Sequence, residues 1–438
     1  MKKQVIDFLH RIEPDKKTQP FLHTLFDGFF TFAFTPNTVT TGKGVHIRDG
    51  VDLKRTMVMV VIALQLAYVF GTYNIGHQHF VALGQHTGFL DGWYLKLAHG
   101  LIKLIPIFVV THVVGLGIEF WYASKKGHPI EEGFLVTGAL IPLIMPPDIP
   151  LWILAISVAF AVIIGKEAFG GTGMNILNIA LLSRVFIFFA YPTTISGDEV
   201  WISGIEKVDG AYVGQMYSMA HGAFDWLFGL FDANLFGAGG KLAVDGYTGA
   251  TPLALAAKGG WTAVTDTYTT SQMFWGNIPG SIGETSKPLI IIGMLLIVLT
   301  GIADWRIVTS GIAGAAVMAF ILEAWGATPF MTVPWEQQII MGSFLFAIAF
   351  MATDPVSAAS TNKGKYFYGF LIGVVGMIVR VMNPAYPEGW MLAILFMNVF
   401  APLIDHYVIE GNISRRKKRA TVVLSRNNAI ASEELQQV

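Results

Sequence analysis

A short polar stretch, DGYTGAT, interrupts a chain otherwise dominated by apolar runs. Its hydroxyls belong to Thr248 and Thr251, with Gly249 and Ala250 between them and Asp245 at the start. Small neighbours leave the oxygen of a threonine open to chemistry. Taken alone, however, such a composition is more typical of a solvated turn. The rest of the chain must therefore decide between a turn and a modified hydroxyl.

Titratable side chains also lie within or near the ends of the apolar runs, where charge is costly and is by default a functional hypothesis. Glu119 and Asp405 each lie near one end of such a run and are candidates for an ion or proton path, since a carboxylate is a suitable ligand for a hard cation. For Asp405 the alternative is a helix-end residue hydrogen-bonded to His406. Other charged residues lie close enough to the ends of the runs to anchor among lipid headgroups, namely Arg184, Asp304, Arg306, Glu323 and Arg380.

Two histidines in one apolar run could suggest haem ligation. His99 and His112 are thirteen residues apart, which is roughly 20 Å along a helix. That separation suits neither a single haem nor a compact metal site, so we expect both rings to be hydrogen-bonded within the core. The chain has no cysteine, which excludes iron–sulfur clusters and disulfides.

Composition sets the class of protein. Of 438 residues, 53% are hydrophobic and only 13% are charged, and apolar runs repeatedly approach the roughly 20 residues that cross a bilayer. The net charge of −1 argues against a nucleic-acid partner. We predict an all-α polytopic membrane protein with about ten spans, at 56–74, 98–121, 133–146, 150–165, 176–192, 287–304, 307–325, 337–352, 366–382 and 389–408.

Basic residues near the ends of the spans predict the orientation. Lysines and arginines precede the first span, and RRKKR follows the last, so both termini should be cytoplasmic. The stretch 193–286 then lies outside, in keeping with its nine acidic residues, three lysines and no arginine. The predicted organisation is a cytoplasmic segment (1–55), a first half (56–192), an outer loop (193–286), a second half (287–408) and a cytoplasmic tail (409–438).

Each predicted half contains an interrupted helix. FGGTGMNILNIALLSR follows the fourth span and FMATDPVSAASTNKGK follows the eighth. Two related halves of five spans must insert in opposite senses, which predicts inverted repeats whose broken helices face each other near the midplane. We also predict amphipathic helices on the outer face at 217–240 and on the inner face in QPFLHTLFDGFFTFAFTP.

The motifs resemble those of one family. DGYTGAT is similar to the flavin-attachment motif Asp-x-x-(Ser/Thr)-Gly-Ala-Thr. Further similar blocks occur in order, including EGFLVTGALIPLIMPP, KEAFGGTGMNILN, FFAYPTTISGD, GNIPGSIGE, FMATDPVSA and RVMNPAYPEGWMLAILFMNVFAPLIDH. Together they resemble the B subunit of the sodium-translocating NADH:quinone oxidoreductase, from about residue 35 to 420.

This resemblance implies a function. In the family, a six-subunit respiratory complex of the bacterial inner membrane oxidises NADH, reduces ubiquinone and pumps sodium ions outward. The B subunit resembles urea transporters in fold and carries riboflavin together with FMN, which is joined by its phosphate to the last threonine of the motif. The resemblance therefore assigns covalent FMN to Thr251, on the periplasmic side, with Asp245, Thr248, Gly249 and Ala250 as the rest of the motif.

Two further sites are expected. Gly170 and Gly171 would let backbone approach a flat ring, and Asn175 and Asn178 would offer amides to the edge of a flavin. Packing of two helices at the glycines is the alternative.

The resemblance also implies a quinone pocket near Gly115 and Glu119, although Leu116 replaces a family glycine there. Asp405 is expected on the sodium path. Two alternative functions remain: the D subunit of the Rnf-type ferredoxin:NAD oxidoreductase, which shares the flavin threonine, and a urea-transporter-like solute channel, which would need no flavin.

Overall fold

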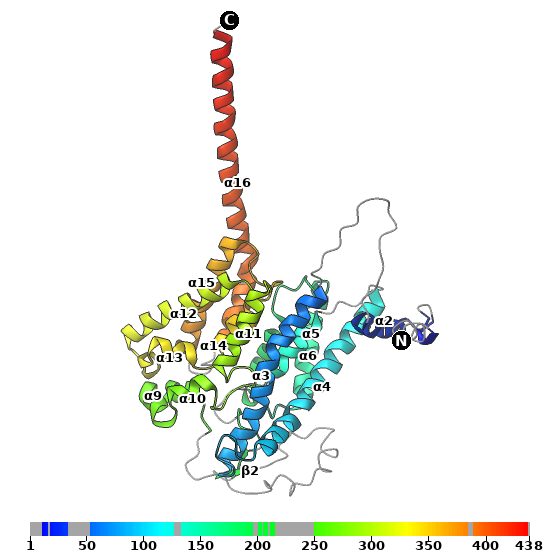
Figure 1. The fold of residues 1–438 in the computed structure, drawn as a ribbon, viewed down its shortest axis with the longest axis vertical. Helices are drawn as coiled ribbons and strands as arrows, with labels where there is room; N and C mark the ends of the chain where they lie inside the picture. The colour runs from blue at the N-terminus through cyan, green and yellow to red at the C-terminus, as the bar shows by residue number, and fades with distance from the viewer. Residues whose placement is uncertain are drawn as a thin grey trace.

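In a computed structural model of the protein, the part of the chain that the structure describes is mostly helical, as predicted (Figure 1). The structure describes residues 11–15, 18–33, 53–126, 133–195, 200–203, 205–208, 211–214, 249–383 and 389–436.

Two groups of helices form the body of the molecule. The first group is α3 (Leu53–Ala82), α4 (Trp93–Lys126), α5 (Phe134–Ile144), α6 (Leu151–Gly165) and α7 (Ile179–Ala190). The second group is α11 (Lys287–Leu299), α12 (Trp305–Trp325), α13 (Trp335–Ile340), α14 (Phe344–Phe346), the π-helical turn η5 (Ala347–Met351), α15 (Asn362–Met382) and α16 (Trp390–Gln436). Each predicted span overlaps one of these helices or, at 337–352, a run of short ones.

Six helices within the described ranges are long and apolar enough to cross a membrane unaided: α3, α4, α6, α12, α15 and α16. Three more are apolar but shorter, namely α5, α7 and α11. The chain is therefore a polytopic membrane protein. The short helices adjoin irregular backbone, which at membrane depth is tolerated only where it is buried in protein or lines a cavity.

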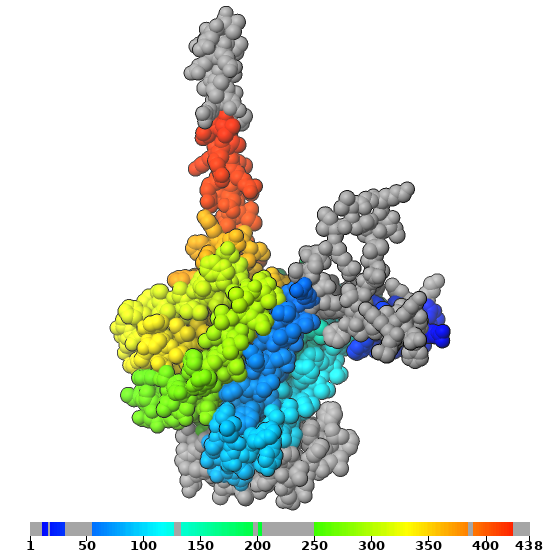
Figure 2. Space-filling model, viewed as in Figure 1, coloured from blue at the N-terminus to red at the C-terminus, as the bar shows by residue number. Residues whose placement is uncertain are grey.

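Several helix contacts of the first group have a counterpart in the second, although that between α3 and α4 has no comparable one between α11 and α12 among the described residues. Within the first, α4 lies against α6, α6 against α7 and α3 against α5. Within the second, α12 lies against α15, α15 against α16 and α11 against α14. The groups meet where α3 contacts α11 and where α7 contacts α16, and the space-filling view shows α3 (blue) beside green α11 (Figure 2).

Glycines allow helices α12 and α15 to pack with their backbones close together. A Cβ atom added at Gly373 would lie 2.3 Å from the carbonyl oxygen of Gly311, and one at Gly314 would lie 2.2 Å from that of Phe370. Gly369 and Gly373 form a GxxxG pattern on α15. Without the hydrophobic effect between helices in lipid, such close backbone contact is what holds two spans together.

Helices α9 (Pro252–Thr267) and α10 (Thr270–Trp275) lie toward the end of the bundle opposite to α16 (Figure 1). A short antiparallel pair, β1 (Ile205–Val208) and β2 (Ala211–Gly214), was not predicted. The amphipathic helix predicted at 217–240 lies outside the described residues.

The predicted N-terminal amphipathic segment forms α2 (Pro20–Ala33), where Phe29 stacks on Phe120 of α4 at 6.3 Å.

Helix α16 extends beyond the predicted span, which ends at 408. It continues to Gln436 and projects alone from the body (Figure 1). The basic residues 415–419 therefore lie on a continuous helix rather than in a separate tail.

Candidate functional site

Thr251 is the N-cap of α9. Its backbone is extended (φ −69°, ψ 157°), its Oγ1 accepts from the backbone N–H of Ala254 at 3.3 Å, and Pro252 takes the first helical position. Threonine at the N-cap followed by proline is a strong start signal for a helix. The hydroxyl therefore lies where unpaired helix N–H groups and the helix dipole favour an anion.

The two residues before Thr251 are fixed by their backbone conformation and by a hydrogen bond. Gly249 has φ 60°, a left-handed conformation that glycine adopts without strain. Ala250 is buried, and its carbonyl oxygen accepts from the Tyr268 hydroxyl at 3.0 Å. Asp245 and Thr248 lie outside the described residues.

A cavity lies between the two broken helices. Gly170 and Gly171 have φ of 120° and 106°, so only glycine suits this turn after α6. The space between the walls, with the open mouth included, is about 820 Å³. Its polar lining residues are Thr56, Thr137, Lys166, Thr172, Asn175, Asn178, Thr353 and Asp354.

Asn178 joins the two breaks. Its Oδ1 caps α7 by accepting from the Leu181 N–H at 3.1 Å, and its Nδ2 donates to Asp354 Oδ2 at 3.5 Å. Asp354 also accepts from the Ser357 hydroxyl at 2.9 Å. Asn175 lines the same cavity and donates to the Leu177 carbonyl at 3.0 Å. The two asparagines singled out in the sequence therefore share one cavity with a carboxylate from the other half.

Glu119 forms a buried ion pair with Lys166, and each side chain is 6% exposed. One helical turn before Glu119, Gly115 packs against Phe134, whose ring leaves no room for a Cβ atom. Lys166 also lines the cavity at the breaks. Through Lys166, Glu119 thus lies next to that cavity.

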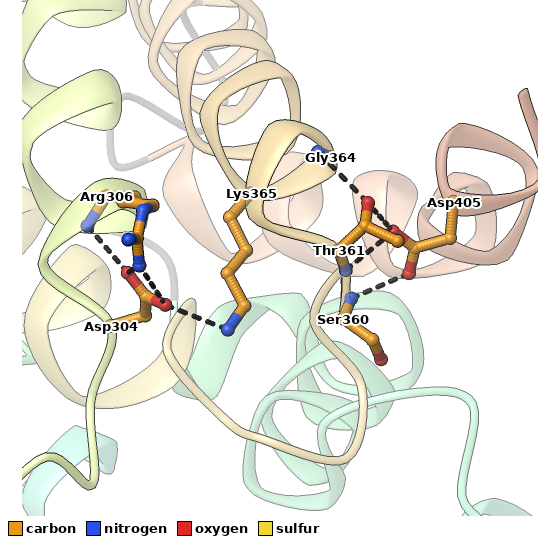
Figure 3. Close-up of polar contacts among 7 residues, drawn as sticks. All are labelled: Asp304, Arg306, Ser360, Thr361, Gly364, Lys365 and Asp405. Atoms are coloured by element: carbon orange, nitrogen blue, oxygen red, sulfur yellow. Dashed lines mark hydrogen bonds and ion pairs between the residues drawn. The ribbon is translucent and has the colours of Figure 1, made fainter. Parts of the chain in front are cut away.

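Asp405 is held by the loop before α15 (Figure 3). Its carboxylate accepts from the Ser360 N–H at 2.6 Å, from the Thr361 N–H at 2.9 Å and from the Thr361 hydroxyl at 2.5 Å. The alternative of a bond to His406 is wrong, because the His406 ring lies instead 3.7 Å from the carboxylate of Glu410. Asp405 therefore ties α16 to the end of the second break.

A second set of charges lies nearby (Figure 3). Asp304 caps α12 and binds Arg306 Nη1 at 3.2 Å and Lys365 Nζ at 2.8 Å.

The other charged residues singled out in the sequence lie elsewhere. Glu323 accepts from the Trp335 N–H at 3.1 Å. Arg184 and Arg380 are buried against the rings of Trp201 and Trp390, at 5.5 and 5.0 Å.

His99 is hydrogen-bonded within the core, whereas the half-buried His112 bonds to a carbonyl of its own helix. His99 Nε2 lies 2.7 Å from the Ser203 hydroxyl, its ring stacks on His79 at 4.0 Å, and His112 Nδ1 lies 2.8 Å from the Phe108 carbonyl. Among the described residues no cluster of three His, Cys, Asp or Glu could hold a metal ion.

Sequence reasoning missed Asp354 and Lys166 as members of the cavity. Asp354 stands in the FMATDPVSA block and Lys166 in KEAFGG. A charged residue beside a helix-breaking glycine or proline at membrane depth was the available signal.

The chain is similar to known proteins along most of its length. The family model "NQR2, RnfD, RnfE family" matches residues 40–414. A protein of Chromohalobacter salexigens, named as the B subunit of a Na(+)-translocating NADH-quinone reductase, is 41% identical, with 91% of each chain covered. Proteins of the same name from Pseudomonas paraeruginosa and Klebsiella pneumoniae are 40% and 39% identical, covering 91% of this chain and 94% of each relative. The chain belongs to the NQR2, RnfD, RnfE family.

Proposed function

We propose that this chain is the flavin-carrying membrane subunit of a sodium-translocating NADH:quinone reductase. It would pass electrons from NADH oxidation toward ubiquinone, coupled to outward movement of Na⁺. The observation that carries this proposal is the match, over nine-tenths of the chain, to relatives that bear that name. The partners would be the other subunits of a six-subunit complex in a bacterial inner membrane.

FMN would be joined through its phosphate to Thr251. The ester phosphate keeps a negative charge, and the N-terminus of α9 favours an anion at this position. The Ala254 N–H, which bonds Oγ1 at 3.3 Å, would hold the ester oxygen in place. When bound, the flavin supplies reversible electron transfer, while the protein supplies attachment and orientation.

Riboflavin would occupy the cavity between the broken helices. Asn175 and Asn178 line this cavity and offer amides, whereas Gly170 and Gly171 form the turn before Thr172, which also lines it. Polar lining groups together with apolar walls, which include Ile179 and Phe350, suit a ring with a polar edge. Ubiquinone would bind near Gly115 and Glu119, beside this cavity, and Asp405 would take part in Na⁺ uptake.

The ten helical segments would form two inverted repeats of five, as in urea transporters. The matching contacts within each group, and the contacts of α3 with α11 and of α7 with α16, are those expected of a two-fold axis between the groups. Both termini would be cytoplasmic and Thr251 periplasmic. The position of α9 opposite to the projecting α16 supports this orientation (Figure 1).

Flavin fluorescence of the denatured chain in a gel tests the proposal. A phosphoester survives denaturation, so the wild-type chain should fluoresce and Thr251→Ala should be dark. Thr248→Ala should still be labelled, because the resemblance assigns the ester to the last threonine. A fluorescent Thr251→Ala chain would contradict the assignment, and a dark wild-type chain would instead favour a solute channel.

The D subunit of the Rnf-type oxidoreductase is the second candidate, because the matching family model also includes it. The two are separated by substrate. A complex purified with this chain should oxidise NADH with quinone; reduction of NAD by reduced ferredoxin would favour the Rnf-type function.

A further inference from the structure

A second cavity opens beside α10, apart from the sites proposed for riboflavin, ubiquinone and Na⁺. Its apolar walls are Phe70 of α3, Phe89 of the following loop, Trp275 at the end of α10, and Pro288 and Leu289 of α11. About 910 Å³ lie between the walls, with the open mouth included. Trp275 is 63% exposed, so much of its indole ring is available to a ligand.

The remaining lining residues are uncharged: Ser271, Gln272, Asn277 and Ser286. Gln272 uses its Oε1 to accept from the Thr269 N–H and hydroxyl, both at 2.9 Å. Asn277 uses its Oδ1 to accept from Gln78 at 3.3 Å. Gln272 can therefore offer a ligand the two donors of its NH₂ group, and Asn277 can offer its NH₂ group together with a second lone pair of Oδ1.

The residues that line the cavity indicate which kind of ligand would fit it. Aromatic side chains favour a flat aromatic ring, which gains from stacked or edge contacts. Two amide donors favour carbonyl oxygens on the edge of that ring. The lining supplies no cation, so the phosphate of a phospholipid would find no charged partner there. An uncharged, flat ring with carbonyls along one edge fits these requirements.

The chain also connects this cavity to Thr251. The Tyr268 hydroxyl donates to the Ala250 carbonyl, so residue 268 lies beside the residue that precedes Thr251. Thr269 then caps α10. Gln272 and Trp275 are three residues apart and share a face of that helix, whereas Met273 is fully buried. The point of attachment at Thr251 is therefore close to α10, the helix that carries Gln272 of the cavity.

We propose that this cavity binds the isoalloxazine ring of the flavin attached at Thr251. The inference rests on the proposed function and is distinct from the cavity between the broken helices. The dimethylbenzene end of the ring lies among Phe70, Phe89 and Trp275, and its carbonyl edge faces Gln272 and Asn277. Trp275 is then in contact with the flavin, although it lies 24 residues from Thr251 in sequence.

Native flavin fluorescence tests this position. An indole in contact with an excited flavin quenches it by electron transfer, so Trp275→Leu should raise the fluorescence of the covalent flavin several-fold. The measurement uses the full chain, purified in detergent after co-expression with its flavin transferase. The same variant carrying Thr251→Ala is subtracted as a blank, which removes the signal of any noncovalent flavin. Fluorescence of the denatured chain should not change, because attachment does not need Trp275.

Trp93→Leu is the matched control. Trp93 begins α4, is 59% exposed and does not line the cavity, so its loss should leave native fluorescence unchanged. Gln272→Ala provides a second variant that keeps Trp275. It should shift the visible absorption of the covalent flavin, because a hydrogen bond to a ring carbonyl is lost.

The outcomes separate this inference from the proposed function. A labelled Trp275→Leu chain whose native fluorescence equals that of the wild type would overturn the ring position and leave the attachment intact. An equal rise in the native flavin fluorescence of Trp93→Leu would also overturn the ring position. Loss of a co-purifying phospholipid from Trp275→Leu, with unchanged flavin fluorescence, would assign the cavity to a lipid. A dark denatured wild-type chain would overturn the attachment at Thr251 and this inference with it.

Discussion

Asn178 and Asp354 lie 176 residues apart in the chain, yet the side-chain amide of one donates to the carboxylate of the other at 3.5 Å. Each residue belongs to a break in a helix, and the contact closes one wall of the cavity between the two groups of helices. A cavity built from both halves requires that both fold correctly. This arrangement suits a cofactor that must be held at a fixed place.

The first prediction concerns Asn175 in this cavity. Asn175→Leu should lower the noncovalent riboflavin content of the purified complex, because it replaces a polar lining amide with an apolar group. Extraction of the native complex and chromatography of the released flavin measure this content. Covalent fluorescence at Thr251 should not change. Asn362→Leu, at an asparagine on α15 that does not line the cavity, should leave both flavins in place. Full riboflavin content and electron transfer in Asn175→Leu would contradict the assignment.

The second prediction is that Asp405→Asn weakens the Na⁺ dependence of quinone reduction. The charge is lost, while an amide oxygen can still accept one of the bonds from Ser360 and Thr361. The Na⁺ concentration for half-maximal activity should rise severalfold. Unchanged Na⁺ dependence would remove Asp405 from the path.

Thr361→Val is the control for the structural part of this effect. It removes the hydroxyl that binds Asp405 at 2.5 Å and caps α15 through the Gly364 N–H, at a cost of about 1 kcal/mol. Thermal unfolding should shift, whereas the Na⁺ dependence should stay as in the wild type.

Helix positions could be predicted from the sequence because hydrophobic length and helix breakers act locally. All ten predicted spans overlap helices of the structure, and the N-terminal amphipathic helix is present. The prediction at 389–408 followed hydropathy and so gave the extent of an apolar span, whereas helix α16 continues to Gln436. The pair β1 and β2 depends on pairing across a turn, which the composition of an outer loop does not reveal.

Contacts between distant segments were harder to predict. Asn175 and Asn178 were found because glycines mark the break beside them, but their shared cavity with Asp354 depends on how the halves pack. Asp405 was found because a carboxylate near the end of a span is unusual. Its bonds to Ser360 and Thr361 could not be predicted, because spacing along one helix says nothing of the loop that packs against it.

The third prediction concerns pH and Asp304. Burial alone would raise the pKa of this carboxyl, but hydrogen bonds from Lys365 and from the Arg306 N–H, together with the two positive charges, hold it below its ordinary value of 3.8. A lowered pKa in the folded state stabilises the protein above that ordinary value, and the contribution is lost as pH falls through the lowered pKa. Asp304→Asn should therefore lower the melting temperature at neutral pH, with a smaller difference from the wild type at pH well below 3.8. A difference that grows on acidification would contradict this.

The last prediction separates stability from quinone binding at Glu119 and Lys166. Lys166→Met removes the ammonium group from the buried ion pair with Glu119, and breaking a buried pair in this way costs roughly 3–5 kcal/mol. The double variant Glu119→Gln with Lys166→Met carries no unpaired charge from this pair, so its thermal unfolding should return toward that of the wild type. If Glu119 also serves the quinone, the KM for ubiquinone should stay raised in the stable double variant. A double variant with both normal stability and a normal KM for ubiquinone would mean that quinone binding does not need the Glu119 carboxylate. The ion pair would then have a structural role only.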